Sequence, residues 1–216
     1  MKTLLLMLPF MPALLFGQIQ AEDTVSGNDV SQVEGLIYRT GSDRPFSGIY
    51  RQHYPDGQLL TEGKYVSGYR EGKWAVWYFN GRKMFEGSYI MGNEHGLRTE
   101  WYEHGEKMFE GNFVNGQREG RWTYWYENGR KYSEGYYTKG KRDGLWLTWL
   151  SNGQKKSETY YLDGQKSVER NYVNGRKEGL WTYWYENGQK KSETEYFNGK
   201  RLNRKEWDEN GIEKMN

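Results

Sequence analysis

Residues 116–139 read GQREGRWTYWYENGRKYSEGYYTK, and most of the chain repeats this stretch with small changes. Gly120 precedes one short aromatic run, Asn128-Gly129 ends it, and a second run continues to Lys139-Gly140. Turn glycines are 11 and then 13 residues apart, which gives a repeat of 24 residues. The same step relates Gly57, Gly81, Gly105, Gly129 and Gly153, and also Gly68, Gly92, Gly116, Gly140 and Gly164. A fixed period of this length indicates a stacked repeat architecture, in which each unit buries its apolar face against its neighbours.

Each segment between two turns is predicted to be a strand. Residues 121–126 are rich in the aromatic and β-branched residues that favour a pleated surface, and Asn128-Gly129 can adopt the positive φ values of a type I′ hairpin turn. A glycine turn every 11 to 13 residues leaves no room for a helix of ordinary length. We therefore predict an all-β fold, an elongated single-layer antiparallel meander of β-hairpins over residues 36–211, followed by a tail at 212–216.

Composition agrees with a thin sheet covered by rings. Apolar residues make up only 35% of the chain, whereas aromatic residues reach 17%. The formal net charge of +2 gives no support for nucleic acid as a partner, because phosphate neutralisation needs a concentrated basic excess. The absence of cysteine excludes disulfides, thiolate metal sites and cysteine nucleophiles.

The N-terminal residues differ in composition from the repeats. Lys2 is followed by an apolar run at residues 4–16 and by small or polar residues up to Ala21. This order is typical of a secretory signal peptide, and the run is short for a membrane span, although an uncleaved anchor is the alternative. We predict a signal peptide at 1–21, a flexible linker at 22–35, and export to the bacterial cell envelope, the periplasm or the medium.

The aromatic residues fall into columns. Trp74, Trp122, Trp146 and Trp181 follow a turn glycine by two residues, while Trp77, Trp101, Trp125, Trp149, Trp184 and Trp207 precede the next one by four. Side chains alternate between the faces of a strand, so each face should carry its own tryptophan row. With a two-residue loop at Asn80-Gly81, Trp74 would lie opposite Gly87 and Trp122 opposite Gly135, and each indole would cover the glycine on that neighbouring strand.

About 13 residues are missing from the pattern between Gly164 and Gly175. Loss of one strand from a meander reverses the direction of every later strand, and this reversal exchanges the two faces. The later tryptophan rows should then change sides unless the chain bulges or loops out there. We predict an irregularity in residues 164–174.

Two charged columns have a structural interpretation. A glutamate recurs at Glu62, Glu86, Glu110, Glu134, Glu158, Glu169 and Glu193, and lysines that recur once per repeat could form cross-strand pairs with it. Basic turn residues such as Arg70, Arg118 and Arg142 should line one rim of the sheet, where the acids that follow them weaken the local positive field. Acid–base catalysis needs two groups with different pKa values, and a row of equivalent carboxylates does not supply them. We therefore predict a protein that is not an enzyme, with no catalytic residue, cofactor or metal.

The aromatic rows are the candidate binding surface. We select Trp77, Trp101, Trp125, Trp149 and Trp184 from one column, and Tyr89, Phe113 and Tyr137 from the column three residues before a turn glycine. The alternative is that these rings only hold the sheet together, because cross-strand aromatic contacts are the main stabilisation of a single layer. Both roles are compatible.

The units at 120–137 and 179–196, with their G-x-W-x-x-W-Y-x-N-G…E-x-x-Y core, resemble the variant MORN repeats of bacteria. The opening RPFSG at 44–48 and YPDG at 54–57 resemble the first unit of antitoxin proteins of the YwqK family. The resemblance implies an elongated sheet of hairpins and a non-enzymatic binding role. Related MORN repeats have been associated with membrane lipid attachment and with protein scaffolding.

Three partners remain open. The resemblance implies a protein partner, such as a toxin-like effector that an antitoxin would neutralise. Aromatic hairpin repeats could also stack on the sugars of a glycan or cell wall, in which case polysaccharide binding should depend on Trp125 and Trp149. A membrane lipid is the third alternative, and the oligomeric state is not predicted.

Overall fold

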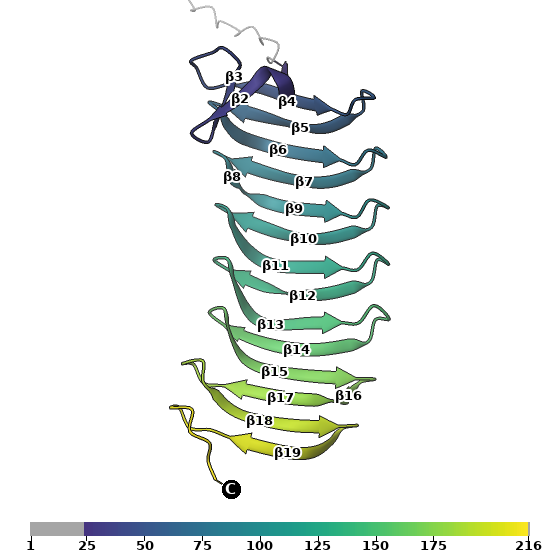
Figure 1. Ribbon diagram of the computed structural model, residues 1–216, viewed down its shortest axis with the longest axis vertical. Coiled ribbons are helices and arrows are strands. Elements are labelled where there is room, and N and C mark those ends of the chain that lie inside the picture. The colour runs from purple at the N-terminus through teal and green to yellow at the C-terminus, as the bar shows by residue number, and fades with distance from the viewer. Residues whose placement is uncertain (1–23, 216) are drawn as a thin grey trace, which may run out of the picture.

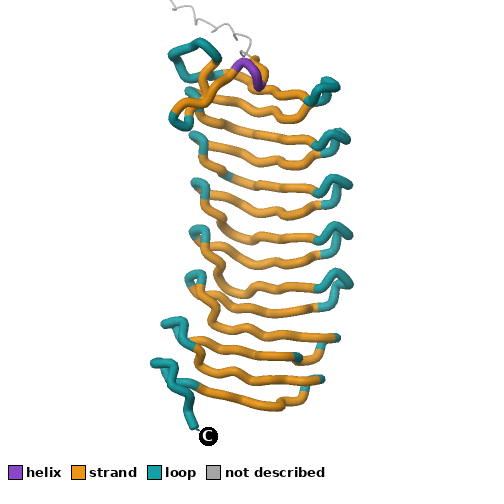
Figure 2. Tube along the Cα trace, viewed as in Figure 1, coloured by secondary structure: helices purple, strands orange, loops and turns teal. Residues whose placement is uncertain are grey.

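The structure, a computed structural model, describes residues 24–215 and consists almost wholly of β-strands (Figures 1 and 2). The elements are β1 (Thr24–Ser26), the 3-10 turn η1 (Gly27–Asp29), β2 (Val30–Val33), β3 (Leu36–Arg39), β4 (Gly48–His53), β5 (Leu59–Val66), β6 (Tyr69–Trp77), β7 (Lys83–Ile90), β8 (Asn93–Glu94), β9 (Gly96–Trp101), β10 (Lys107–Val114), β11 (Gln117–Trp125), β12 (Lys131–Thr138), β13 (Lys141–Trp149), β14 (Lys155–Leu162), β15 (Gln165–Val173), β16 (Arg176–Lys177), β17 (Gly179–Trp184), β18 (Lys190–Phe197) and β19 (Lys200–Glu206). From β4 to β19 each strand pairs antiparallel with the next, and the short β8 and β16 lead into β9 and β17. The predicted single-layer meander of hairpins is confirmed.

Two kinds of turn alternate along the sheet. In the first kind, a non-glycine residue with φ near +50° precedes a glycine with positive φ, as in Lys139-Gly140, and the flanking residues Thr138 and Lys141 pair directly. These are the two-residue type I′ turns. They occur at Ser67, Met91, Asn115, Lys139, Asp163, Asn174 and Asn198, each with the glycine that follows.

The turns at the other set of glycines have three residues. Gly129 N–H donates to the Tyr126 carbonyl at 3.0 Å, and Tyr126 N–H donates to the Arg130 carbonyl at 2.8 Å. Asn128 is not in the left-handed region, whereas Gly129 is, with φ 75°. This is a type I turn followed by a left-handed glycine, so the predicted type I′ turn at Asn128-Gly129 is wrong. The cause is the Asn128 side chain, whose oxygen accepts the Arg130 N–H at 3.1 Å and whose amide donates to Ser151 O at 3.0 Å.

The predicted tryptophan register is confirmed, because Trp74 pairs with Gly87 and Trp122 with Gly135. The glycine that each indole covers is a different one. A Cβ atom added to Gly111 would lie 2.2 Å from the Trp122 ring, so Trp122 covers the preceding strand, not the following one. The indole is held there because Trp122 Nε1 donates to Asn112 O of β10 at 3.2 Å, beside the β-bulge between β10 and β11.

One face of the sheet is closed by rings. From β5 to β13 it carries the packed aromatic face, which consists of Tyr65, Trp74, Tyr89, Phe113, Trp122, Tyr137 and Trp146, all buried. Trp122 is fully buried, and its ring centroid lies 5.1 Å from that of Phe113 and 5.6 Å from that of Tyr137. Edge-to-face contacts of this kind stabilise aromatic pairs beyond the area that they bury.

The opposite face carries the second tryptophan row. Trp125 is three residues from Trp122 on β11, and alternation along the strand places the two on opposite faces. We call this the tryptophan–lysine face and define it by Trp77, Trp101, Trp125 and Trp149 and by the lysines at Lys83, Lys107, Lys131 and Lys155. The prediction of one tryptophan row on each face is confirmed.

The first strands form a cap over the start of the packed aromatic face. β1 pairs parallel with β4, β2 and β3 form a separate hairpin, and Ile37 N–H donates to Gly68 O at 3.1 Å. Val25 and Phe46 are buried with Tyr65 and Trp74. In the described part of the segment predicted as a linker, residues 24–33 form β1, η1 and β2, and Val25 packs with Tyr65 and Trp74. The signal peptide predicted at 1–21 lies outside the described residues.

The predicted irregularity lies between β14 and β17. The chain does not loop out; instead two type I′ turns follow each other, at Asp163-Gly164 and Asn174-Gly175. The two kinds of turn exchange edges at this point, and Figures 1 and 2 show the larger loops at the right up to β14 and at the left after β17.

The faces are exchanged as well. Tyr172 of β15 belongs to the buried-ring column, yet it donates to Glu158 Oε2 at 2.9 Å, and Lys155 Nζ lies 4.1 Å from its ring centroid. Tyr172 also contacts Trp181, with ring centroids 5.4 Å apart. The rings of β15 and β17 thus lie on the side where β14 carries its lysine and glutamate. The predicted change of sides is confirmed.

Candidate binding surface

Three of the predicted binding residues are buried. Tyr89, Phe113 and Tyr137 belong to the packed aromatic face, where neighbouring rings and arginines cover them. Arg118 lies over this face, with its guanidinium carbon 4.7 Å from the Trp122 centroid, and it donates to the Tyr137 hydroxyl at 2.9 Å. These three residues therefore act as core.

The arginines also correct the prediction of a solvated basic rim. Arg70, Arg118 and Arg142 lie over tryptophan rings at 4.3 to 4.8 Å. Burial by itself would raise the pKa of Tyr137, but hydrogen bonds with Tyr124, Arg142 and Arg118 lower that pKa below its ordinary value. These arginines stabilise the aromatic packing by cation–π contact and by hydrogen bonds to phenol groups.

The acids that follow these arginines have a different role from the one predicted. The Glu119 carboxylate accepts the N–H of Lys139 at 2.8 Å, in the type I′ turn of the next hairpin. Glu71 accepts from Met91 at 2.9 Å, and Glu178 from Asn198 at 2.8 Å. The acids thus connect consecutive turns along the edge of the sheet.

The other five predicted residues are half-buried tryptophans. Trp77, Trp101, Trp125 and Trp149 lie on the tryptophan–lysine face, and Trp184 lies on the opposite side of the sheet because the faces exchange before β17. Lys107 Nζ lies 5.7 Å from the Trp125 ring centroid, and Lys131 Nζ lies 6.0 Å from that of Trp149. The structure thus brings four of the five together on one face.

The glutamate column pairs with these lysines. Lys131 Nζ lies 2.6 Å from Glu134 Oε2, and the same pair recurs at Lys155–Glu158 and Lys190–Glu193. Pairing is confirmed, but it occurs within one strand, across a bulge, where cross-strand pairs were predicted. The cross-strand partner of Glu134 is Arg121, at 2.7 Å. Burial would raise the pKa of Glu134, but its hydrogen bonds to Lys131 and Arg121 lower it below the ordinary value.

Sequence reasoning missed two exposed apolar residues of this face. Tyr136 is 54% exposed and Leu145 is 37% exposed, and with Leu147, Arg121 and Glu134 they line a cavity of about 340 Å³. We call this cavity the central groove. The signal for it was present, because Tyr136 directly precedes the buried Tyr137 and must point to the other face.

The described part of the chain shows no constellation for metal chemistry. Between residues 24 and 215, no three His, Asp or Glu side chains gather closely enough to hold a metal ion. In the same range, no helix has the length and apolar character needed to cross a membrane.

A comparison with protein families identifies the repeat. Residues 46–67, 94–115, 118–139, 142–163 and 177–198 each match the MORN repeat variant, and together they cover just over half of the chain. The chain belongs to the MORN repeat variant family. Each MORN repeat variant match spans one hairpin, as 118–139 spans most of β11, the three-residue loop and β12. A comparison with curated proteins finds no match.

Proposed function

We propose that this MORN repeat variant protein is a non-enzymatic module that binds another protein through its tryptophan–lysine face. One contrast supports this proposal. The rings of the packed aromatic face are buried against each other, whereas Tyr136 and Leu145 of the central groove are open to solvent. Exposed aromatic groups on a rigid scaffold bind partners at a small entropic cost.

The surroundings of the central groove resemble a protein interface in composition. The apolar centre of Tyr136, Leu145 and Leu147 is bordered by Arg121 and Glu134, which form an ion pair. Protein interfaces combine an apolar centre, rich in tyrosine, tryptophan and arginine, with a polar rim. A polypeptide with apolar side chains flanked by charges of both signs would match this surface.

The cellular role is the finer part of the proposal. The resemblance to YwqK-family antitoxins suggests that the partner is a toxin-like effector that binding would neutralise. The apolar leader at 4–16 supports export to the bacterial cell envelope. A mature N-terminus after Ala21 in an exported fraction, found by mass spectrometry, would support this location, and an uncleaved cytosolic chain would contradict it.

Photo-crosslinking of the full chain tests the binding face. A crosslinking residue at Tyr136 should capture a discrete partner protein in the producing cells. The matched control is Leu180, which is 44% exposed but points away from the side of Trp181 and therefore lies on the other side of the sheet. Leu145→Ala should weaken capture of that partner by about tenfold, as loss of an interface anchor does. Equal capture from Tyr136 and Leu180 would contradict the proposal.

A further inference from the structure

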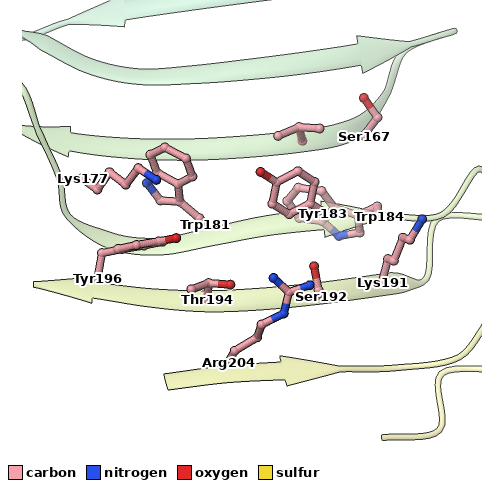
Figure 3. Close-up of a pocket in the computed structure, with 11 residues that line it drawn as sticks. Ser167, Lys177, Trp181, Tyr183, Trp184, Lys191, Ser192, Thr194, Tyr196 and Arg204 are labelled. Atoms are coloured by element: carbon pink, nitrogen blue, oxygen red, sulfur yellow. The ribbon is translucent and has the colours of Figure 1, made fainter. Parts of the chain in front are cut away.

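A second cavity lies at the C-terminal end of the array, on the same side of the sheet as the central groove. It has a volume of about 440 Å³, within the ~300–1,000 Å³ range of small-molecule pockets. Figure 3 shows its side chains, which come from β15 to β19. We call it the terminal pocket and define it by Trp181, Tyr183, Ser192, Thr194, Lys191 and Arg204.

The terminal pocket exists because the indole of the regular repeat is missing and no other ring takes its place. In a regular repeat, one tryptophan stands three residues before another, as Trp122 stands before Trp125. At the same distance before Trp207 the chain has Arg204 of β19 instead of a tryptophan. An arginine occurs at this position once more, at Arg98 before Trp101, but there the rings of Phe85 and Phe109 cover it at 5.0 and 5.5 Å. Beside Arg204 the corresponding position holds the small Ser192, so the space stays open.

The pocket offers hydroxyl groups that earlier units use internally. Ser133, which corresponds to Ser192, donates to Leu147 O of the next strand at 3.0 Å, and Ser157 bonds Thr148 at 2.6 Å. In the described part of the chain, Ser192 and Thr194 have no such side-chain hydrogen bond. Figure 3 shows Tyr183 on the strand next to Ser192 and Thr194. Ser192 and Thr194 line the pocket with only 6% and 3% of their surface exposed, so a ligand hydroxyl has to enter the pocket to reach them.

The charge of the lining is positive. Lys177, Lys191 and Arg204 line the pocket, and no acidic residue of the described part lines it, although Glu206 pairs with Arg204. Arg204 Nε donates to Glu206 Oε1 at 2.7 Å and Arg204 Nη2 lies 2.7 Å from the same oxygen, so this ion pair fixes the guanidinium and leaves Nη1 as the group that points to other partners. Lys177 Nζ lies 4.4 Å from the Trp181 centroid and is held over the ring. Fixed cations beside aromatic rings favour a ligand that has both a flat apolar surface and an anionic group.

We propose that the terminal pocket binds an acidic sugar, a pyranose ring that carries a carboxylate. Tyr183 supplies the apolar contact for the C–H face of the ring, beside the buried Trp181, which Lys177 and Arg170 cover. Ser192 and Thr194 bond its hydroxyls, and Arg204 and Lys191 pair with its carboxylate. This site goes beyond the proposed protein-binding function, since it uses other residues and another class of ligand.

Calorimetric titration of the full chain with an α-1,4-linked trigalacturonate tests the proposal. Binding should be detectable and should weaken as salt is raised, because the pair with Arg204 is open to solvent. Arg204→Ala should weaken binding by about tenfold or more, as loss of a charge-assisted hydrogen bond does. The matched control is Arg201→Ala, which removes a basic residue of the same strand that does not line the pocket, and it should leave binding within about twofold.

The second variant is Tyr183→Leu, with Tyr183→Phe beside it to separate the ring from the hydroxyl. Both should unfold cooperatively like the parent chain, and the leucine variant should lose more affinity. Absence of trigalacturonate binding, equal loss with Arg201→Ala and Arg204→Ala, or equal affinity for neutral maltotriose would each overturn the proposal. Tighter binding of a poly-glutamate peptide would also overturn it, in favour of an acidic polypeptide. None of these outcomes involves the partner captured at Tyr136, so the two proposals fail independently.

Discussion

At the scale of single residues, the sheet depends on a match between glycine and tryptophan on neighbouring strands. A Cβ atom on Gly63, Gly111 or Gly135 would lie 2.0 to 2.3 Å from an indole, far inside van der Waals contact. These glycines have no positive φ, so space and not backbone conformation requires them. The missing side chain is what allows the large ring to lie flat on the strand.

The first prediction compares two of these glycines. Gly135→Ala should destabilise the protein by about 1–3 kcal/mol, as overpacking does, because the Trp146 ring must move. Gly87→Ala is the matched control, since its Cβ would meet only the tip of Phe85 at 2.8 Å and this side chain can turn aside. Urea unfolding of both variants measures the difference. A Gly135→Ala variant as stable as the parent would show that the indole contact is unimportant.

Sequence reasoning at this scale found the rings but not their burial. The columns placed Trp122 and Trp125 on opposite faces, which is confirmed. Alternation placed Tyr136 and Tyr137 on opposite faces, but it did not show which face is closed by packed rings, because the packing depends on bulges such as the one between Gly111 and Asn112. The local sequence of a bulge, a glycine between polar residues, is the same as that of an ordinary turn.

At the scale of elements, each hairpin is defined by its turn. The type I′ turns place a residue before glycine at φ near +50°, a conformation that suits asparagine and strains most other side chains. Asn115, Asn174 and Asn198 match this demand, whereas Met91 and Lys139 do not. Repeats of one chain therefore differ in turn strain at an equivalent position.

The second prediction uses this difference. Lys139→Asn should stabilise the protein by about 1 kcal/mol, because asparagine is tolerated in the left-handed region. The reciprocal Asn115→Lys should destabilise it by a similar amount. The bond from the backbone N–H of Lys139 to Glu119 is kept in either case. Thermal unfolding of the two variants would contradict this reasoning if both shifted in the same direction.

The third prediction concerns the lysine–glutamate pairs. The pKa of Glu134 is below its ordinary value in the folded state, so its contribution to stability is present above the ordinary carboxyl pKa of about 4.3 and is lost as pH falls through the lowered pKa. Unfolding from pH 7 to pH 3 should show a smaller loss of stability in Glu134→Gln than in the parent. Glu127→Gln, in the adjacent loop and without an ion pair in the described residues, should follow the parent. Identical pH profiles for all three proteins would contradict the role of the pair.

The turn types themselves were only partly predictable. The 24-residue period showed where the chain reverses, because glycine is needed at both sets of turns. It did not show which set is the two-residue turn, since Asn128-Gly129 has the sequence typical of type I′. The side chain of Asn128 bonds the next unit at Ser151, and no single hairpin contains that contact.

At the scale of the whole molecule, contacts run from each strand to its neighbours, and stability should be close to a sum over units. The N-terminal end has a cap, in which β1 to β3 cover Tyr65 and Trp74. This cap was not predictable from the polar composition of residues 22–35, because only a few apolar residues in it meet the rings. In contrast, the missing strand near Gly164 was visible as a change in spacing, and the reversal that it implies follows from geometry alone.

The fourth prediction compares two deletions. Removal of residues 118–141 deletes one complete 24-residue unit and joins Gln117 to Arg142, so every remaining ring keeps its side. The protein should stay folded, with a lower midpoint of thermal unfolding. Removal of residues 118–130 deletes one strand and moves every later side chain to the other side of the sheet. The new junction has no counterpart of Arg170, which lies over Tyr160, Trp181 and Tyr183 in the natural junction. It should lower the midpoint further, and equal midpoints by circular dichroism would contradict this.

The exchange of sides between β14 and β17 also makes the two ends of each side of the sheet chemically different. Along the sheet, one side begins with half-buried tryptophans beside lysine ammonium groups and ends with tyrosine rings and the terminal pocket. The other side begins with packed rings and ends with half-buried tryptophans beside lysines. A polymer lying along the first of these sides would meet the central groove, which suits protein side chains, and then the terminal pocket, which suits an anionic sugar ring. This difference between the two ends follows from the half-unit that the repeat pattern lacks between Gly164 and Gly175.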